Sequence, residues 1–327
     1  MSPEERQHRL RIIIAFALVY VLWGSTYLGI RIAVYDIPPA TMAGTRFLVA
    51  GGLMLAWCAF TRRKIALSRQ DFRRIGSVGV LLLTGGNVSV AFAEQYVASG
   101  VAALIVASVP IWVAVIEAFL LRGDRLSRRG LGGLALGIGG LAVLLWPKLR
   151  AASLGGNMEL VGSLVLVAAS LSWATGSVFS RRWSLSVDHY VATAWQMVIA
   201  GLVDVSLGFA LGESARVQWT PRGLAAIAYL VVAGSWVGHT AYVWLLNHVP
   251  TPKVATYAYV NPVVAVFLGW LLLDESVNAN ILLGAAIIVG AVALVNTSRV
   301  VRPATPASTA PPIPAKVTLP ACETGAD

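Results

Sequence analysis

The residues best suited to chemistry are a few charged and polar side chains set within long apolar stretches. Arg46, Glu94 and Asp204 stand at such positions, where an ionisable group is costly and marks a functional site by default. We expect Arg46 to pair with Glu94 or Asp204, and to serve structure or gating. Direct contact between Arg46 and a bound molecule is the alternative interpretation.

Asn87 and His239 form a second pair of candidates. Each lies in the inner part of an apolar stretch, where a polar side chain does not face lipid comfortably. A histidine titrates near neutral pH, so His239 can couple the movement of a solute to a proton. The other interpretation is a buried neutral histidine that hydrogen-bonds a neighbour.

A pair of polar residues and a pair of prolines predict a binding face. Tyr257 and Asn261 are four residues apart and therefore share one face of a helix. Pro110 and Pro262 each free a backbone carbonyl one turn earlier, which predicts two kinks at a central cavity. Hydrogen bonding between membrane helices explains the Tyr and Asn equally well, and such helices commonly tolerate proline.

An internal repeat links these candidates. Trp23 and Arg31 recur as Trp173 and Arg181 about 150 residues later, and a missed repeat would assign the wrong fold. Two more matches follow at a slightly larger offset: Asn87 with His239, and Pro110 with Pro262. Each repeated tryptophan precedes small residues, so its ring either forms a cavity wall beside a small notch or simply packs.

Composition places the chain in a membrane. It is 57% hydrophobic and 12% charged, whereas soluble domains carry about 25% charged residues. The apolar stretches are about 20 residues long, enough to cross a hydrocarbon core of ~30 Å. The net charge of +10 lies mostly in short loops, which indicates membrane orientation and argues against a nucleic-acid partner. Cys58 and Cys322 are too few for a disulfide framework.

The fold class that follows is an all-α polytopic membrane protein with ten transmembrane helices. The stretches must be helices, because lipid leaves the backbone of an isolated strand unpaired. We expect them at residues 11–34, 39–61, 73–94, 98–121, 129–146, 158–181, 188–210, 223–246, 252–273 and 278–298. Most Lys and Arg residues fall on one side when the loops alternate, which predicts that both termini are cytoplasmic.

The domain organisation follows from the repeat. Each half holds five helices, an odd number, so the second half enters the membrane upside down, a layout typical of secondary transporters. We expect a cytoplasmic N-terminus (1–10), a first five-helix repeat (11–147), a linker (148–157), a second five-helix repeat (158–298) and a disordered, proline-rich cytoplasmic tail (299–327). Small residues in the fifth and tenth helices are candidates for a homodimer surface or for peripheral packing.

Several chemistries lack their sequence motif. There is no GxxxxGK[ST] phosphate loop, no HExxH, no paired Cys/His metal spacing and no Gly-x-Ser-x-Gly elbow. We therefore expect no cofactor, no metal site and no catalytic residue, and we do not expect an enzyme.

The same residues resemble a known family. The segments that carry the resemblance are Trp23 to Arg31, Pro38 to Phe47, Ser99 to Leu104, Val109-Pro110, and Tyr257 to Pro262. Together they resemble the EamA-type members of the drug/metabolite transporter superfamily, from about residue 12 to residue 298. The resemblance implies ten helices in two inverted five-helix repeats, and export of metabolites, amino acids or related small compounds. It also implies that these residues face or shape a central cavity: Trp23, Tyr27, Pro110, Tyr257 and Asn261.

The expected function is therefore secondary transport across a bacterial inner membrane. We expect export of a small metabolite by alternating access, with a small-molecule substrate and the lipid bilayer as partners. The expected substrate-cavity residues are Trp23, Tyr27, Asn87, Pro110, Trp173, His239, Tyr257 and Asn261. Energy coupling stays open between proton antiport and facilitated diffusion. Two rival functions are a lipid-modifying membrane enzyme, which needs convergent acid–base or metal residues, and a receptor or scaffold, which needs a domain outside the membrane.

Overall fold

Helices make up all the regular structure that the computed structural model describes, which covers residues 3–117, 128–152, 158–249 and 257–297. Seven helices in these ranges are long and apolar enough to cross a membrane: Pro3–Ala33, Pro39–Phe60, Arg69–Ala93, Arg128–Pro147, Met158–Arg182, His189–Ala210 and Pro221–Tyr242. Three shorter apolar helices accompany them: Ser99–Val115, Tyr257–Leu273 and Ala279–Val295. The expectation of an all-α polytopic membrane protein is confirmed.

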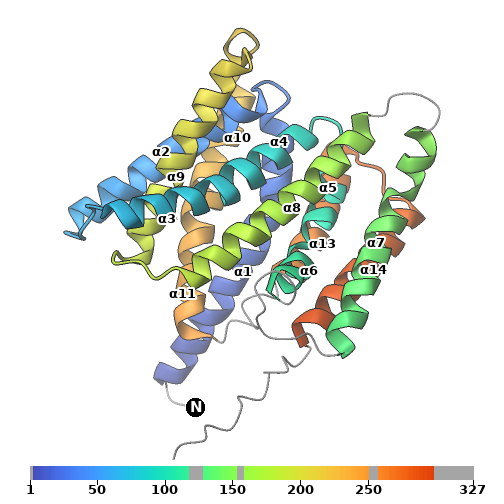
Figure 1. Ribbon diagram of the computed structural model, residues 1–327, viewed down its shortest axis with the longest axis horizontal. Coiled ribbons are helices and arrows are strands. Elements are labelled where there is room, and N and C mark those ends of the chain that lie inside the picture. The colour runs from blue at the N-terminus through green and yellow to red at the C-terminus, as the bar shows by residue number, and fades with distance from the viewer. Residues whose placement is uncertain (1–2, 118–127, 153–157, 250–256, 298–327) are drawn as a thin grey trace, which may run out of the picture.

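The elements run in one series along the chain (Figure 1). Up to residue 152 they are α1 (Pro3–Ala33), α2 (Pro39–Phe60), α3 (Arg69–Gly79), η1 (Val80–Val88), α4 (Ser89–Ala93), α5 (Ser99–Val106), α6 (Val109–Val115) and α7 (Arg128–Ala152). From residue 158 they are α8 (Met158–Arg182), α9 (His189–Ala210), η3 (Glu213–Ala215), α10 (Pro221–Tyr229), η4 (Leu230–Gly238), α11 (His239–His248), α13 (Tyr257–Leu273) and α14 (Ala279–Thr297). The segments η1 and η4 are π-helical, and η3 is a 3₁₀ turn.

Local sequence explains where several helices begin. Ser68, Asp188 and Thr220 are N-cap residues whose side chains accept a hydrogen bond from a backbone amide of the first turn. These bonds satisfy donors that have no partner within the helix. Pro39 and Pro221 occupy first-turn positions, where the missing amide hydrogen of proline costs nothing.

The structure departs from the expected boundaries in three places. Helix α1 begins at Pro3, so most of the segment expected to precede the first span is helical. Helix α7 continues to Ala152, into the segment expected to be a linker. The fourth span is divided into α5 and α6 just before Pro110, whereas α13 runs unbroken through Pro262. The expected tail, residues 299–327, lies outside the described residues.

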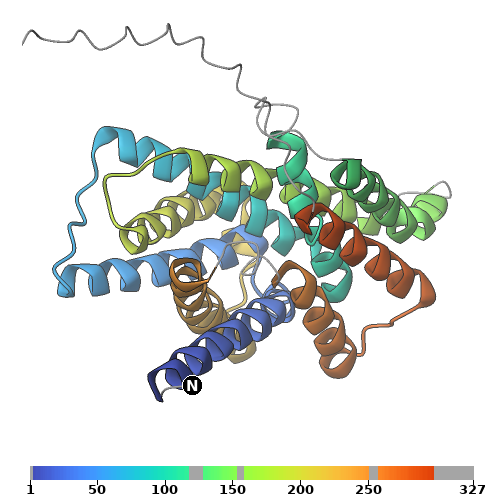
Figure 2. The same ribbon diagram turned by 90° about the horizontal axis from the view of Figure 1, so that it is seen from below.

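Two helix pairs lie at opposite sides of the molecule. Helix α2 packs against α9, and α7 packs against α14 (Figure 1). Both pairs also lie apart from one another in the perpendicular view (Figure 2). Small residues bring the backbones close: a methyl group at Gly51 would lie 2.9 Å from the carbonyl oxygen of Ala194, and one at Gly133 3.1 Å from that of Ala291. The glycine face expected in the fifth span therefore serves, at Gly133, as packing within the chain.

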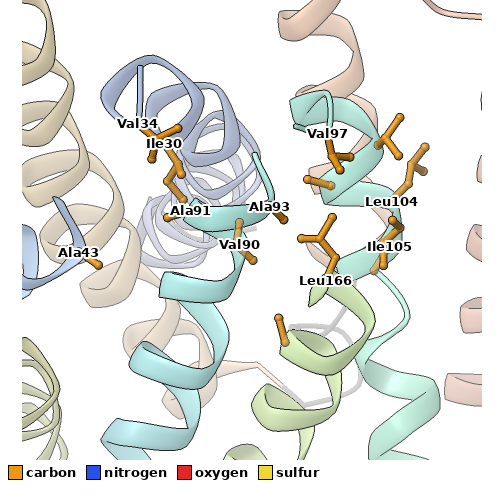
Figure 3. Close-up of a cluster of buried hydrophobic side chains, with 14 of the residues drawn as sticks. Ile30, Val34, Ala43, Val90, Ala91, Ala93, Val97, Leu104, Ile105 and Leu166 are labelled. Carbon is orange, nitrogen blue, oxygen red and sulfur yellow. The ribbon is translucent and has the colours of Figure 1, made fainter. Parts of the chain in front are cut away.

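The apolar core joins elements that are distant in sequence. Ile30 of α1, Val90 of α4, Leu104 of α5 and Leu166 of α8 gather in one buried cluster (Figure 3). The outer surface instead carries large exposed apolar side chains such as Phe209, as a surface that faces lipid tails does.

Candidate functional site

A cavity of about 200 Å³ lies between the helices, and it is called the central cavity below. Residues from α1, α2, η1, α4, α5, α6, α8, α9, η4, α11 and α13 line it. The lining includes every residue expected at a substrate cavity: Trp23, Tyr27, Asn87, Pro110, Trp173, His239, Tyr257 and Asn261. The structure therefore brings together residues that are distant in the sequence, from Trp23 in α1 to Asn261 in α13.

The two repeated tryptophans each pack against a π-helical segment of the other half of the chain. The indole Nε1 of Trp23 donates a hydrogen bond to the carbonyl oxygen of Gly234 in η4, over 3.1 Å. Trp173 lies against η1, where a methyl group at Gly86 would come within 2.7 Å of its ring. The space beside each ring was expected at the small residues that follow the tryptophan. It is instead provided by a glycine of the neighbouring π-helical segment. Both rings form cavity walls.

An aromatic cluster adjoins the cavity at Trp23. The ring centroid of Trp23 lies 5.0 Å from that of Tyr242 and 5.2 Å from that of Tyr257. The centroids of the two tyrosine rings lie 5.9 Å apart. Such edge and tilted contacts are favourable geometries for aromatic rings. Sequence reasoning missed Tyr242, although it follows His239 by three residues and shares its helix face.

The two polar residues matched by the repeat both reach the central cavity. His239 opens α11, and its Nε2 lies 3.1 Å from the hydroxyl oxygen of Thr193 on α9. This contact agrees with a half-buried histidine that hydrogen-bonds a neighbour. Asn87 lies in η1 and lines the same cavity. Each residue therefore adjoins the end of a π-helical segment.

Arg46 is placed differently from the expectation. Its guanidinium lines the central cavity, only 6% of the residue is exposed, and its Nε donates to the hydroxyl oxygen of Ser235 over 3.2 Å. Among the described residues no ion pair joins Arg46 to Glu94 or Asp204, so the predicted pairing is wrong. The reason is the direction of its side chain, which leaves α2 toward η4.

The two carboxyl residues lie elsewhere. Asp204 of α9 faces η1, where its Oδ1 accepts a hydrogen bond from the hydroxyl of Thr84 over 2.5 Å. Glu94 is fully buried at the end of α4, and its carboxyl oxygens accept no hydrogen bond from the part of the chain that the structure describes. Neither residue lines the central cavity. Their expected role in gating or structure stays a prediction.

The cavity also contains a buried polar atom that lacks a partner. The side-chain Oδ1 of Asn261 is buried and accepts no hydrogen bond from any described residue. Helix α13 holds this residue close to α1, because a methyl group at Gly24 would lie 3.1 Å from the carbonyl oxygen of Asn261. An unsatisfied buried oxygen is costly, so a bound molecule that donates a hydrogen bond would stabilise this site.

Sequence reasoning missed several lining residues, among them Thr26, Phe47, Met197 and Ser235. Ser235 carried a usable signal, since it stands four residues before His239 and therefore on the same helix face. Within the described ranges, no three His, Cys, Asp or Glu side chains gather in a way that could hold a metal ion.

Comparisons with known proteins agree on a family of transporters. Residues 10–146 and 160–297 each match the EamA-like transporter family. The "Uncharacterized inner membrane transporter YedA" of Escherichia coli (strain K12) is 38% identical over 294 residues, covering 89% of this chain and 92% of YedA. A "Probable amino-acid metabolite efflux pump" of the same organism is 25% identical, covering 83% of this chain and 90% of the pump.

A solved crystal structure gives an independent comparison of the fold. It superposes with a TM-score of 0.61 and covers 87% of this chain and 96% of its own chain. Its sequence is 19% identical, so the likeness concerns the helical fold alone.

Proposed function

Because this chain belongs to the EamA-like transporter family, we propose that it is a bacterial inner-membrane secondary transporter that exports a small metabolite, an amino acid or a related compound. The observation that carries this proposal is the central cavity, which lies between apolar helices and is lined by aromatic and polar side chains. The relative named as an inner membrane transporter supports the location, and the relative named as an efflux pump supports export of a small metabolite.

The proposed mechanism is alternating access between two inverted five-helix repeats, residues 11–147 and 158–298, with both termini in the cytoplasm. The helix contacts support this arrangement. In a ten-span numbering, α2 and α9 are spans two and seven, and α7 and α14 are spans five and ten. Helix α1 (span one) contacts α13 (span nine), and α8 (span six) contacts α6 (span four). Adding five to a span number in the first half gives its equivalent in the second, so the contact of one with nine is equivalent to that of six with four. The first two contacts join equivalent spans of the two halves, and the last two contacts are counterparts of one another.

The two π-helical segments are the proposed hinges of this motion. Val80–Val88 and Leu230–Gly238 stand about 150 residues apart, the same offset as Trp23 and Trp173, and π-helical turns occur frequently at functional sites. Each segment lines the cavity and contacts the tryptophan of the other half. A change in the backbone hydrogen-bond register of η1 or η4 would thus move a cavity wall.

Energy coupling and assembly belong to the same proposal. His239 lines the cavity and has a hydrogen-bond partner on another helix, which suits proton coupling, with facilitated diffusion as the alternative. A homodimer would use the outer faces of α7 and α14, where methyl groups at Gly132, Gly139 and Gly290 would meet no other atom within 4 Å.

The test is transport by the purified protein in proteoliposomes. A panel of labelled metabolites is followed in both directions, with and without a pH gradient. We expect at least one solute to move, and we expect Trp23→Ala or Tyr257→Ala to reduce its transport at least tenfold. Trp270→Ala is the matched control, because Trp270 is 54% exposed on the outer face of α13. If no solute moved under either condition, secondary transport would be the wrong function.

A further inference from the structure

We propose that the solute carried through the central cavity is an organic monocarboxylate of net charge −1 whose carboxylate binds Arg46. This inference rests on the proposed transport function and adds the chemical class of the substrate. It reverses the interpretation of Arg46 as a residue of structure or gating, because Arg46 lines the cavity and its Nη2 lies beside Gly234, another lining residue.

The charge balance of the cavity is the first argument. Among the described residues that line it, Arg46 is the only Lys, Arg, Asp or Glu. Its side chain is buried, and no described carboxylate lies within ion-pair distance of it. The Phe47 ring, whose centroid lies 4.9 Å from Cζ of Arg46, gives a cation–π contact, but it carries no negative charge. A buried charge without a counter-ion is strongly unfavourable. A bound anion would supply the missing charge, and dissociation of the anion would restore the vacant state that transport requires.

The hydrogen-bond donors of Arg46 are the second argument. A guanidinium has five N–H donors in a planar fork that matches a carboxylate. Only the Nε donor has a partner among the described residues, the hydroxyl oxygen of Ser235. That oxygen accepts from Arg46, so the hydroxyl hydrogen of Ser235 is still available for a second acceptor. Arg46 and Ser235 together therefore present several donors to one anion.

The other residues that line the cavity indicate the size and polarity of the rest of the solute. Trp23, Trp173, Tyr257 and Phe47 surround the space with rings, which suits an aromatic or branched apolar group. The unpartnered Oδ1 of Asn261 is a buried acceptor, which suits a hydroxyl on the solute. The volume of about 200 Å³ is below the roughly 300–1,000 Å³ of sites for drug-sized ligands, so the solute is small.

The same balance disfavours two other charge classes. An α-amino acid brings an ammonium group with its carboxylate, and the site would keep its uncompensated positive charge. An amine or amide of net charge +1 would add a second positive charge beside Arg46. No described carboxylate lines the cavity to offset either one. The site is therefore expected to rank otherwise equal solutes as anion first, zwitterion second and cation last.

Three probes that share one carbon skeleton test this ranking: phenyllactate, phenylalanine and phenylalaninamide, of charge −1, 0 and +1 at about pH 6, where an α-amino group is fully protonated. Binding to the detergent-purified protein is measured as the shift in unfolding temperature, and transport is measured in proteoliposomes. We expect phenyllactate to bind at least tenfold more tightly than phenylalanine, with no binding of the amide. Equal or tighter binding of phenylalanine or the amide overturns the inference, and so does a failure of phenyllactate to stabilise the protein.

Variants separate recognition of charge from a structural role. Arg46→Lys is expected to keep the preference for phenyllactate with weaker binding, and Arg46→Gln is expected to abolish that preference. Arg216→Gln removes the same charge from an exposed loop and is expected to change nothing. An equal loss for all three probes in Arg46→Gln would assign Arg46 to structure and overturn the inference. Transport of other panel solutes, but not of phenyllactate, would leave the transport function intact and refute only the substrate class.

Discussion

At the residue scale, the packing around Gly234 connects three functional elements. Its carbonyl oxygen accepts the indole hydrogen of Trp23, and its Cα hydrogens face Thr26 and the guanidinium of Arg46. A methyl group at Gly234 would lie 2.9 Å from Cγ2 of Thr26 and 3.1 Å from Nη2 of Arg46. No larger residue fits there without movement, so the small side chain sets the separation of α1, α2 and η4.

The corresponding variant is Gly234→Ala. We expect it to lower the free energy of unfolding by about 1–3 kcal/mol, the usual cost of overpacking, and to reduce transport further by displacing Arg46. Thermal unfolding in detergent and transport in proteoliposomes measure the two effects. Gly52→Ala is the control, since Gly52 is exposed on α2 and a methyl group there would meet no atom within 4 Å. Equal stability of the two variants would contradict the close packing described at Gly234.

Residue types alone could predict the lining of the cavity but not the pairing within it. Polar residues such as Asn87 and His239 stand out in apolar stretches and recur in the repeat, so each was a candidate before its surroundings were known. The partner of Arg46 depends on which face of α2 meets which neighbour, and apolar residues surround Arg46 in the sequence on every side. Tertiary packing directs its guanidinium to Ser235 rather than to a carboxylate.

At the element scale, two glutamates hold the beginnings of helices that are distant in sequence. The carboxylate of Glu213 accepts hydrogen bonds from the backbone amides of Ala40 and Thr41, over 3.3 and 2.8 Å, in the first turn of α2. Glu275 accepts from the amides of Ser99 and Gly100, over 2.8 and 3.2 Å, at the start of α5. Both place a negative charge at the positive end of a helix.

We expect Glu213→Ala and Glu275→Ala each to lower the free energy of unfolding by about 0.5–2 kcal/mol, as the loss of a helix cap does. The physical reason is that the amides of the first turn lose their acceptor in a poorly hydrated place. Thermal unfolding in detergent gives the measurement. Glu4→Ala is the control, because Glu4 is exposed in the first turn of α1. If Glu213→Ala or Glu275→Ala were as stable as this control, water would be accepting the hydrogen bonds of the first-turn amides in place of the carboxylate.

The sequence could predict most of the helices, but it could not predict that Glu213 and Glu275 cap α2 and α5. Apolar length and the proline and N-cap signals place the helices, and Pro110 predicts the division between α5 and α6. The caps join residues 172 and 176 positions apart, so no local pattern contains them. The π-helical segments also escape prediction, because nine residues in a long apolar stretch carry no distinct periodicity. Packing against Trp23 and Trp173 distinguishes them only in three dimensions.

At the scale of the whole molecule, polar contacts between loops define two ends. At one end the residues between α1 and α2 meet those between α9 and α10: Asp36 accepts from Thr220 over 2.5 Å and lies 3.5 Å from Nε of Arg222. At the other end the loops after α2 and α8 meet through Arg63 and Asp188, over 2.7 Å. Loops of the two halves thus meet at both ends, which is the arrangement that the proposed repeats of opposite orientation would produce.

The orientation of these ends gives the last prediction. Arg62, Arg63 and Lys64 stand together in the loop after α2, and basic loops stay in the cytoplasm. Reporter fusions after Arg62 should therefore report the cytoplasm, and fusions after Gly212, in the loop between α9 and α10, should report the exterior. The first loop follows two spans and the second follows seven, so opposite reports require an odd number of spans between them. The same report from both sites would refute the inverted repeat, and with it the symmetry on which alternating access depends.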